Sequence, residues 1–237
     1  MRDFTAPRLF VHADLPGPIA FDQRQTNYLK NVLRLAPGAS ILVFNGRDGE
    51  WRAEVAELGK KAGGAEAVEK TAAQTRRPTL VYAFAPLKQA RFDYMVEKAT
   101  EMGAGRLVPV LTQHGQVRKI NRERLAANIV EACEQCGILC VPQIDEPVAL
   151  SDFLGSLDRP LVVADEALAG DAMDAVATIR AAGSPLAVLV GPEGGFSAEE
   201  RALFAPRAVR VSLGPRILRA DTAAVALLAL VEAAFPS

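Results

Sequence analysis

The sequence predicts an α/β domain that follows a small, mostly β module. After residue 78, short apolar runs alternate with helical patterns, and strands that are apolar on both faces are typical of a parallel sheet covered on both sides. Before residue 75, short strands are instead separated by turns. The segment 74–78, which contains two arginines and a proline, is the best candidate for a linker. We therefore expect two domains, residues 1–75 and 76–237.

The N-terminal module is expected to hold several strands and one helix. Asp22 has the residue type of a helix N-cap, and the apolar spacing of the next residues predicts a helix that ends before Pro37. The glycine-rich turn 45–49 is typical of a β-hairpin. The expected strands cover residues 8–11, 40–44, 51–58 and 65–71.

The C-terminal domain is expected to alternate strands and helices. The apolar runs that predict strands cover residues 79–85, 106–112, 160–166, 185–191 and 208–214. The helical patterns cover residues 88–102, 121–137 and 171–182. The most apolar stretch, 222–235, is too short to span a bilayer and predicts a buried helix, so we expect no membrane association.

Composition narrows the class of protein. Half of the 237 residues are hydrophobic and 23% are charged, with a net charge of −1, which excludes a disordered chain and a polycationic tail. Residues 1–77 carry 12 Lys and Arg against 9 Asp and Glu, a net +3 that is compatible with a module that binds phosphate.

The clustered Cys133, Cys136 and Cys140 do not predict a disulfide framework, so we expect a reducing, cytoplasmic location. Their C-x2-C-x3-C spacing invites an iron–sulfur interpretation, but they lie on an expected helix without an obvious fourth ligand, so we expect small buried side chains and no metal.

A glycine-bearing loop follows the strand expected at 185–191. The run Gly191-Pro192-Glu193-Gly194-Gly195 leads to Ser197 and Glu200, whose spacing predicts a capping box that opens a helix. Glycines permit positive φ angles and close backbone approach, and ligands of open parallel sheets bind beyond the carboxyl ends of strands. The loop is a candidate ligand loop, with a plain strand–helix turn as the alternative. It matches neither the Rossmann nor the phosphate-loop pattern.

Charged residues in two other segments are further candidates. Arg219 and Asp221 lie between strongly apolar stretches, where charges are usually paired or used in chemistry. Lys88 and Arg91 lie in the first turn of an expected helix, where the helix dipole disfavours cations. That placement suggests a contact with phosphate, with a solvated helix end as the alternative.

Together these segments resemble a known family. The runs LVGPEGGFSAEE and VSLGPRILRADTA are similar to the cofactor-binding signature of the ribosomal RNA small subunit methyltransferase E family. The segment KQARFDYMVEKATEMGAGRLVPVLT resembles the first methyltransferase helix and strand of that family, and RLFV and NYLKNVLRL resemble its N-terminal region. The resemblance extends over essentially the whole chain in the same order.

The resemblance implies a fold and an activity. The family belongs to the SPOUT methyltransferases, which implies a parallel α/β sheet with a C-terminal trefoil knot, an exception to unknotted topology, and a small N-terminal PUA-like β-barrel that binds RNA. It also implies a homodimer that transfers methyl from S-adenosylmethionine to N3 of one uridine in 16S ribosomal RNA of the small subunit. Two alternatives stay open: a SPOUT methyltransferase acting on another RNA such as transfer RNA, and a catalytically inactive RNA-binding ribosome assembly factor.

The resemblance also implies roles for residues. Cofactor contacts are implied for two loops and a helix start, which comprise Val190, Gly191, Glu193, Gly194, Gly195, Leu213, Gly214, Ile217, Leu218, Arg219, Thr222 and Ala223. The candidates for RNA contact are Arg8, Arg24, Lys30, Arg34, Lys88 and Arg91. Arg219 is the candidate cation for charge that develops on the base, and Glu193 and Asp221 are candidate general bases.

The sequence departs from the family pattern in three places. Asp221 stands where the family usually has Glu, which shortens the reach of the carboxylate by one methylene. Cys136 and Ile138 stand where Ser and Arg are usual, and the segment 113–115, which includes His114, replaces a more usual Arg-Ser. The missing arginines make the substrate pocket less typical of the family than the cofactor pocket.

Overall fold

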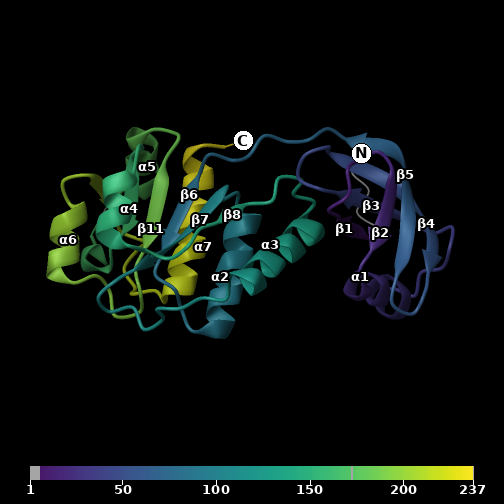
Figure 1. The fold of residues 1–237 in the computed structure, drawn as a ribbon. Coiled ribbons are helices and arrows are strands. Elements are labelled where there is room, and N and C mark those ends of the chain that lie inside the picture. Colours follow the sequence, from purple (N-terminus) through teal and green to yellow (C-terminus); the bar gives the residue numbers. More distant parts are fainter. Residues whose placement is uncertain (1–5, 172, 237) are drawn as a thin grey trace. The chain divides into compact units, whose positions relative to one another are not determined.

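The computed structural model describes residues 6–171 and 173–236. The chain forms two compact units (Figure 1). The first unit comprises Met1–Arg76 together with Cys133–Val141, and the second comprises Arg77–Ala132 and Pro142–Ser237. The first unit is therefore built from two separate stretches of chain, whereas the expected division at residue 75 is a single cut.

The first unit contains a five-stranded sheet in the order β1-β3-β4-β5-β2. β1 pairs with β3 in parallel and the other pairs are antiparallel. The strands are β1 (Arg8–Phe10), β2 (Pro18–Phe21), β3 (Ser40–Phe44), β4 (Glu50–Leu58) and β5 (Gly63–Ala72). The expected strands are all present; β2 was not predicted, because four residues that begin with proline carry little periodicity.

The helix of the first unit differs from the prediction in its second half. α1 (Gln23–Asn27) begins at a capping box between Asp22 and Gln25, which confirms the predicted N-cap. It continues as a π-helical turn, η1 (Tyr28–Val32), rather than as one regular helix. The inward side chains of this unit form one apolar core with the sheet, and they include Leu9, Ile19, Leu29, Val43 and Val55.

The second unit contains a parallel sheet, as the apolar runs predict. Its strand order is β12-β10-β11-β6-β7-β8, with β9 paired to β7, and every recorded pair is parallel. The strands are β6 (Val81–Phe84), β7 (Arg106–Leu111), β8 (Gln143–Ile144), β9 (Val148–Ala149), β10 (Leu161–Ala164), β11 (Ala187–Val190) and β12 (Ala208–Val211). β11 lies between β6 and β10, although β10 precedes it in the chain.

Helices cover both faces of this sheet. They are α2 (Gln89–Glu101), α3 (Arg122–Cys136), α4 (Leu150–Ser156), the short 3-10 turn η2 (Glu166–Leu168), α5 (Ala175–Ala182), α6 (Ala198–Phe204) and α7 (Ala220–Ala234). Successive residues of β6 point to opposite faces. Val81 and Ala83 pack in one core with side chains of α4 and α6, and Phe84 contacts Phe92 of α2 with ring centroids 5.6 Å apart.

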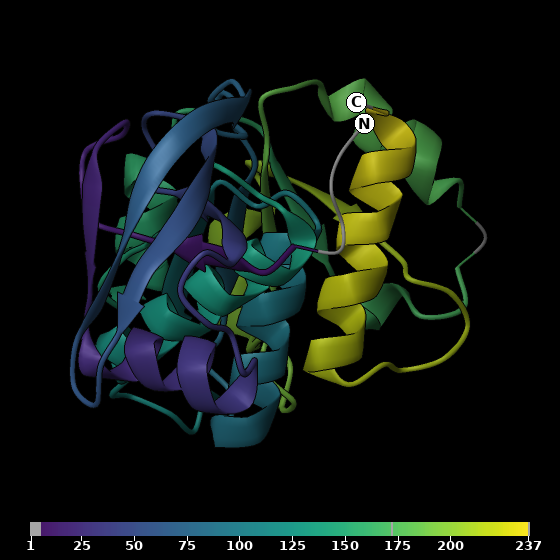
Figure 2. The ribbon, with the colours of Figure 1, turned by 90° about the vertical axis from the view of Figure 1, so that its right-hand side faces the viewer.

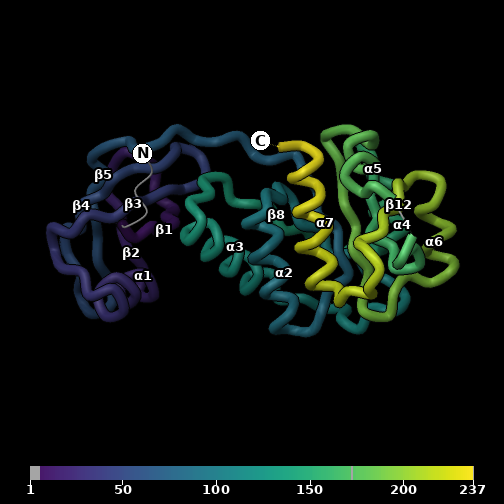
Figure 3. The backbone as a smooth tube through the Cα atoms, turned by 180° about the vertical axis from the view of Figure 1, so that it is seen from behind, coloured from purple at the N-terminus to yellow at the C-terminus, as the bar shows by residue number. Residues whose placement is uncertain are grey.

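The C-terminal helix α7 packs against α2, α5 and β11 (Figures 2 and 3). Figure 3 shows it between α2 and α5. Its buried face includes Leu227 and Leu228, which confirms the prediction of a buried helix in the most apolar stretch. Helix α5 begins at Ala175 after the N-cap Asp174, four residues later than predicted. In the described part of the chain, no helix is long and apolar enough to cross a membrane.

Candidate functional site

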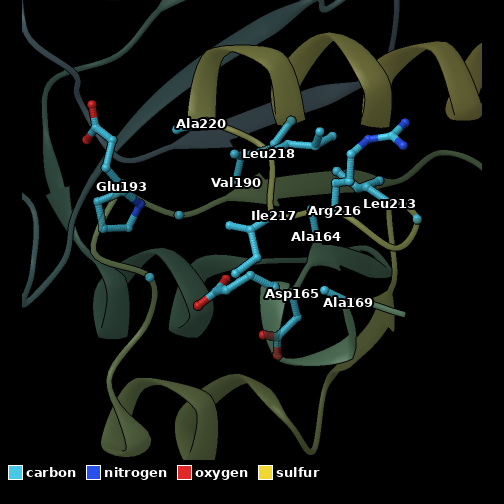
Figure 4. A pocket seen from close by; sticks show the side chains of 16 residues that line it. Ala164, Asp165, Ala169, Val190, Glu193, Leu213, Arg216, Ile217, Leu218 and Ala220 are labelled. Atoms are coloured by element: carbon cyan, nitrogen blue, oxygen red, sulfur yellow. The ribbon is translucent and has the colours of Figure 1, made fainter. Parts of the chain in front are cut away.

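A cavity lies where three segments of the second unit meet (Figure 4). Its walls come from the residues after β10, the glycine-bearing loop after β11, and the loop that joins β12 to α7. Because β10 pairs in parallel with both β11 and β12, the carboxyl ends of the three strands meet at one edge of the sheet. The cavity measures about 70 Å³, and the space reaches about 570 Å³ when the part open to solvent is included.

Most of the cofactor residues expected from the sequence line this cavity, which we call the donor cavity. They are Val190, Gly191, Glu193, Gly195, Leu213, Gly214, Ile217, Leu218 and Ala223. Gly194, Arg219 and Thr222 belong to the same segments but are not among the described residues that line it. The sequence did not predict the third wall, which consists mainly of Ala164, Asp165, Glu166 and Ala169. The acidic residues at the end of the predicted strand 160–166 were the only hint of this wall in the sequence. Only the strand order shows that this end lies beside β11.

A buried carboxylate fixes the wall after β10. The side chain of Asp165 has no exposed surface, and its two oxygens bind the Nε atoms of Arg201 and Arg210 at 3.3 and 2.7 Å. Arg201 also pairs with Glu166 and donates to the carbonyl of Phe196. Since a buried charge needs partners, this network holds η2, α6 and β12 in one arrangement around the cavity.

The glycine loop approaches its neighbours too closely for larger residues. Gly195 has φ +68°, and a Cβ on it would lie 2.1 Å from Glu166 Oε1. A Cβ on Gly191 would lie 2.9 Å from the ring of Phe196. Gly195 is therefore favoured mainly by its positive φ angle, and at Gly191 a larger residue would press against the Phe196 ring.

Hydrogen bonds connect the glycine loop to the loop after β7. The capping box is present: Ser197 Oγ accepts from Glu200 N, and Glu200 Oε2 accepts from Ser197 N at 2.9 Å. The other oxygen of Glu200 accepts from Gln113 N at 2.8 Å. His114 Nδ1 lies 3.0 and 3.1 Å from the carbonyl oxygens of Gly194 and Gly195 and donates to them in the tautomer that carries a proton there.

The two candidate general bases face the same arginine. Arg91 lies in the first turn of α2. Its Nη1 atom is 3.5 Å from Glu193 Oε1, and its Nε atom is 4.0 Å from Asp221 Oδ2. Asp221 is the more buried of the two carboxylates, with 17% of its side chain exposed against 40% for Glu193. Burial raises the pKa of the nearby Tyr82 phenol well above its usual value, and the charge of Asp221 adds to that rise. The structure thus gathers Asp221 and Arg91 around Glu193, which lines the cavity.

Arg219 lies at the N-cap position of α7 and is exposed. Within the described residues it forms no ion pair, so the structure does not use it as a salt bridge inside the fold. Asp221 Oδ1 instead accepts from Thr222 N at 2.8 Å. A free guanidinium at the start of a helix is available to a ligand.

One of the candidate RNA contacts is engaged inside the first unit. The side chain of Arg8 is only 6% exposed. Its Nε atom lies 2.6 Å from Glu50 Oε2, and its Nη1 atom donates to the carbonyl of Glu134, so both bonds lie within the first unit. Arg24, Lys30 and Arg34 are exposed on α1 and the turn after it. Lys30 Nζ also donates to the carbonyl of Leu58 at 2.7 Å.

The cysteines differ in exposure. Cys133 and Cys140 are buried, as expected, whereas Cys136, the last residue of α3, is exposed. Among the residues that the structure describes, no group of three or more His, Cys, Asp or Glu is arranged to hold a metal ion.

Comparison with known proteins identifies the family. A family model described as an RNA methyltransferase domain matches residues 75–232, and one described as an RNA methyltransferase PUA domain matches residues 21–63. Ribosomal RNA small subunit methyltransferase E of Rickettsia conorii is 32% identical over 208 residues, which cover 87% of this chain and 85% of the relative. The protein of that name from Synechocystis sp. is 30% identical over 239 residues, 98% of this chain and 77% of the relative.

Solved structures agree in fold. A methyltransferase from Legionella pneumophila in complex with the cofactor SAM is 28% identical, with a TM-score of 0.81 over 97% of this chain and 98% of the other. Ribosomal RNA small subunit methyltransferase E from Neisseria gonorrhoeae, bound to S-adenosyl methionine, gives 0.84 at 24% identity over 96% and 97% of the two chains, a likeness of fold alone. This chain therefore belongs to the RNA methyltransferase family and, within it, to the ribosomal RNA small subunit methyltransferase E proteins.

Proposed function

We propose that this protein transfers a methyl group from S-adenosylmethionine to N3 of a uridine in 16S ribosomal RNA of the small subunit. The observation that carries the proposal is the donor cavity, where the glycine loop and the loop before α7 meet at the carboxyl edge of the parallel sheet. The family and the cofactor-bound relative from Legionella pneumophila support the same activity.

The lining of the donor cavity suits a sulfonium nucleoside. Val190, Leu213 and Leu218 offer apolar walls for a flat base, and the backbone of the glycine loop offers donors and acceptors without a Cβ in the way. The loop that carries the 78% exposed Ile217 forms one side of this cavity. The other cofactor contacts that we propose are Gly191, Glu193, Gly194, Gly195, Gly214, Ile217, Arg219, Thr222 and Ala223.

The acceptor chemistry needs a proton acceptor and a cation. When bound, S-adenosylmethionine supplies an electrophilic methyl group, so the protein's own task is to position the reactants and to ionise the base. Uracil N3 carries a proton that must leave before it can attack, and either Glu193 or Asp221 takes that proton. Arg219 then stabilises the negative charge that spreads over the uracil oxygens. Because N3 lies on the pairing edge of the base, the uridine must be unpaired or flipped out.

The remaining parts of the proposal concern the whole chain. Residues 76–237 form the SPOUT methyltransferase domain, and the insertion of β11 between β6 and β10 together with the return of α7 onto β11 favours a trefoil knot there. Residues 1–75 form a PUA-like β-barrel whose exposed Arg24, Lys30 and Arg34 contact RNA. The active protein is a homodimer.

A direct assay tests the function. Small ribosomal subunits from a strain that lacks the methyltransferase are incubated with the protein and tritiated S-adenosylmethionine, and the product is mapped by mass spectrometry. We expect one methyl group on N3 of one uridine of 16S RNA. Methylation of transfer RNA alone would show another substrate. Calorimetry without any heat of cofactor binding would instead indicate an inactive assembly factor.

A further inference from the structure

A second, larger cavity lies in the second unit beside the donor cavity. It measures about 600 Å³, within the range of ligand pockets. Its walls are the start of α2, the loop between β7 and α3, and the first turn of α3. Leu87, Phe92 and Leu125 give it an apolar floor, and Lys88, Lys119 and Asn121 are polar residues of its lining. We call it the basic cavity.

The charges of the basic cavity are only partly neutralised. Arg124 pairs with Asp93, which fixes the first turn of α3 against α2. In the described chain, Lys88 and Lys119 form no ion pair, and neither does the neighbouring exposed Arg118. Two unpaired lysines above an apolar floor match a group that carries a negative charge at one end and a flat apolar surface at the other.

Two of the segments that form the basic cavity, α2 and the loop after β7, also contact the glycine loop of the donor cavity. Arg91, one turn after Lys88 in α2, reaches Glu193 at 3.5 Å. His114, in the same loop as Lys119, lies 3.0 Å from the carbonyl oxygen of Gly194. A ligand in the basic cavity would therefore lie next to the place where the methyl group is transferred.

We propose that the basic cavity binds a nucleotide of the RNA substrate that flanks the methylated uridine. Lys88 and Lys119 bind its phosphate, and its base packs over the apolar floor beside Phe92. A flanking nucleotide held there would orient an unpaired uridine toward the donor cavity. This inference rests on the proposed function, and it assigns part of the RNA recognition to Lys119 in the loop after β7.

A double substitution, Lys88→Ala with Lys119→Ala, tests the proposal in the full-length protein. We expect the KM for small ribosomal subunits to rise about tenfold or more, with little change in kcat and in the Kd for S-adenosylmethionine. The slope of log K for RNA against log salt should become shallower by about 0.7–0.9 for each phosphate that the variant no longer neutralises. The matched control is Lys98→Ala, which lies on the same helix, pairs with Glu101 and lies outside the cavity. That control should keep the wild-type KM and slope.

Other results would overturn the inference while leaving the proposed function standing. A double variant with wild-type RNA affinity and salt slope would show that the basic cavity does not meet RNA. Loss of S-adenosylmethionine binding in calorimetry would place the lysines in the donor site instead. A change in sedimentation coefficient would assign the cavity to an interface between copies of the chain. A failure of the proposed function is distinguishable, because the unsubstituted protein would then methylate no subunit.

Discussion

Gly195 shows how one residue determines the shape of the donor cavity. It combines a positive φ angle with a close neighbour, the Glu166 carboxylate, which a methyl group would have to displace. We predict that Gly195→Ala raises the Kd for S-adenosylmethionine about tenfold or more, because a Cβ on Gly195 would meet Glu166 and displace the loop that lines the cavity. The measurement is calorimetric titration.

The control for this substitution is Gly183→Ala at the end of α5. Gly183 has a similar φ of +86°, but no atom lies within 4 Å of the position of its Cβ, and it does not line the cavity. The Gly183→Ala variant should be somewhat less stable to heat and keep its affinity. An equal fall in affinity in the two variants would mean that a general destabilisation, and not the loop, explains the result.

Substitution of Arg219 tests the methyl-transfer step directly. We predict that Arg219→Ala lowers the rate of methyl transfer by about 10²-fold, as expected for the loss of one group that stabilises a developing oxyanion. The melting temperature of this variant should equal that of the unsubstituted protein, because the Arg219 side chain is exposed and forms no ion pair with the described residues. Initial rates on small subunits measure the effect, and Arg219→Lys should recover part of the rate. A wild-type rate in the alanine variant would remove Arg219 from the reaction.

The buried Cys133 gives a pH-dependent prediction. Burial raises the pKa of its thiol to about 12, with smaller contributions from the nearby Cys140, Cys136 and Glu134. In the unfolded chain the pKa is about 8.5, so the contribution to stability is complete below that pH and is lost as the pH rises toward 12. At pH 8 we expect iodoacetamide to label the exposed Cys136 and to leave Cys133 unmodified until urea is added. Mass spectrometry identifies the labelled cysteines. Labelling of Cys133 before urea is added would contradict this prediction.

At the scale of elements, Glu200 joins the helix α6 to the loop after β7. Its carboxylate is buried and accepts from Ser197 N and Gln113 N. We predict that Glu200→Ala lowers the free energy of unfolding by about 1–3 kcal/mol, because two backbone donors lose their acceptor, and that it weakens cofactor binding. Thermal melts and hydrogen exchange at residues 111–115 measure the change. Glu199→Ala, at an exposed neighbouring position, removes only a bond to Ser197 and leaves the acceptor of Gln113 N in place, so it should cost less stability and keep cofactor affinity.

The sequence predicted the elements better than their arrangement. The apolar runs identified the longer strands, and Ser197 with Glu200 identified the start of α6 because capping chemistry is local. It could not predict that the residues after β10 form a wall of the donor cavity, because strand order depends on pairings distant in sequence. The π turn in η1 and the two-residue strands β8 and β9 also leave no periodic signal. The burial of Arg8 depends on Glu134, which is far away in the chain.

At the scale of the whole molecule, the first unit depends on a short distant segment. Phe10 N donates to Glu134 Oε1 at 2.8 Å, and Gln74 Nε2 donates to the carbonyl of Leu139 at 3.1 Å. We predict that a fragment of residues 1–76 is less stable than the same fragment joined by a flexible linker to residues 133–141, by about 1 kcal/mol for each hydrogen bond restored. Fluorescence of Trp51 during urea unfolding measures this difference. Identical unfolding curves would show that the segment contributes nothing.

The discontinuity of the first unit has a consequence for synthesis on the ribosome. Val141 is translated after β6, α2 and β7 of the second unit, although it completes the first. At about 5–20 residues per second, the N-terminal sheet waits several seconds for its last segment. A nascent chain stalled near residue 110 would thus expose the surface that the segment 133–141 later covers, and a chimaera that exchanges the N-terminal module between relatives must carry this segment with it.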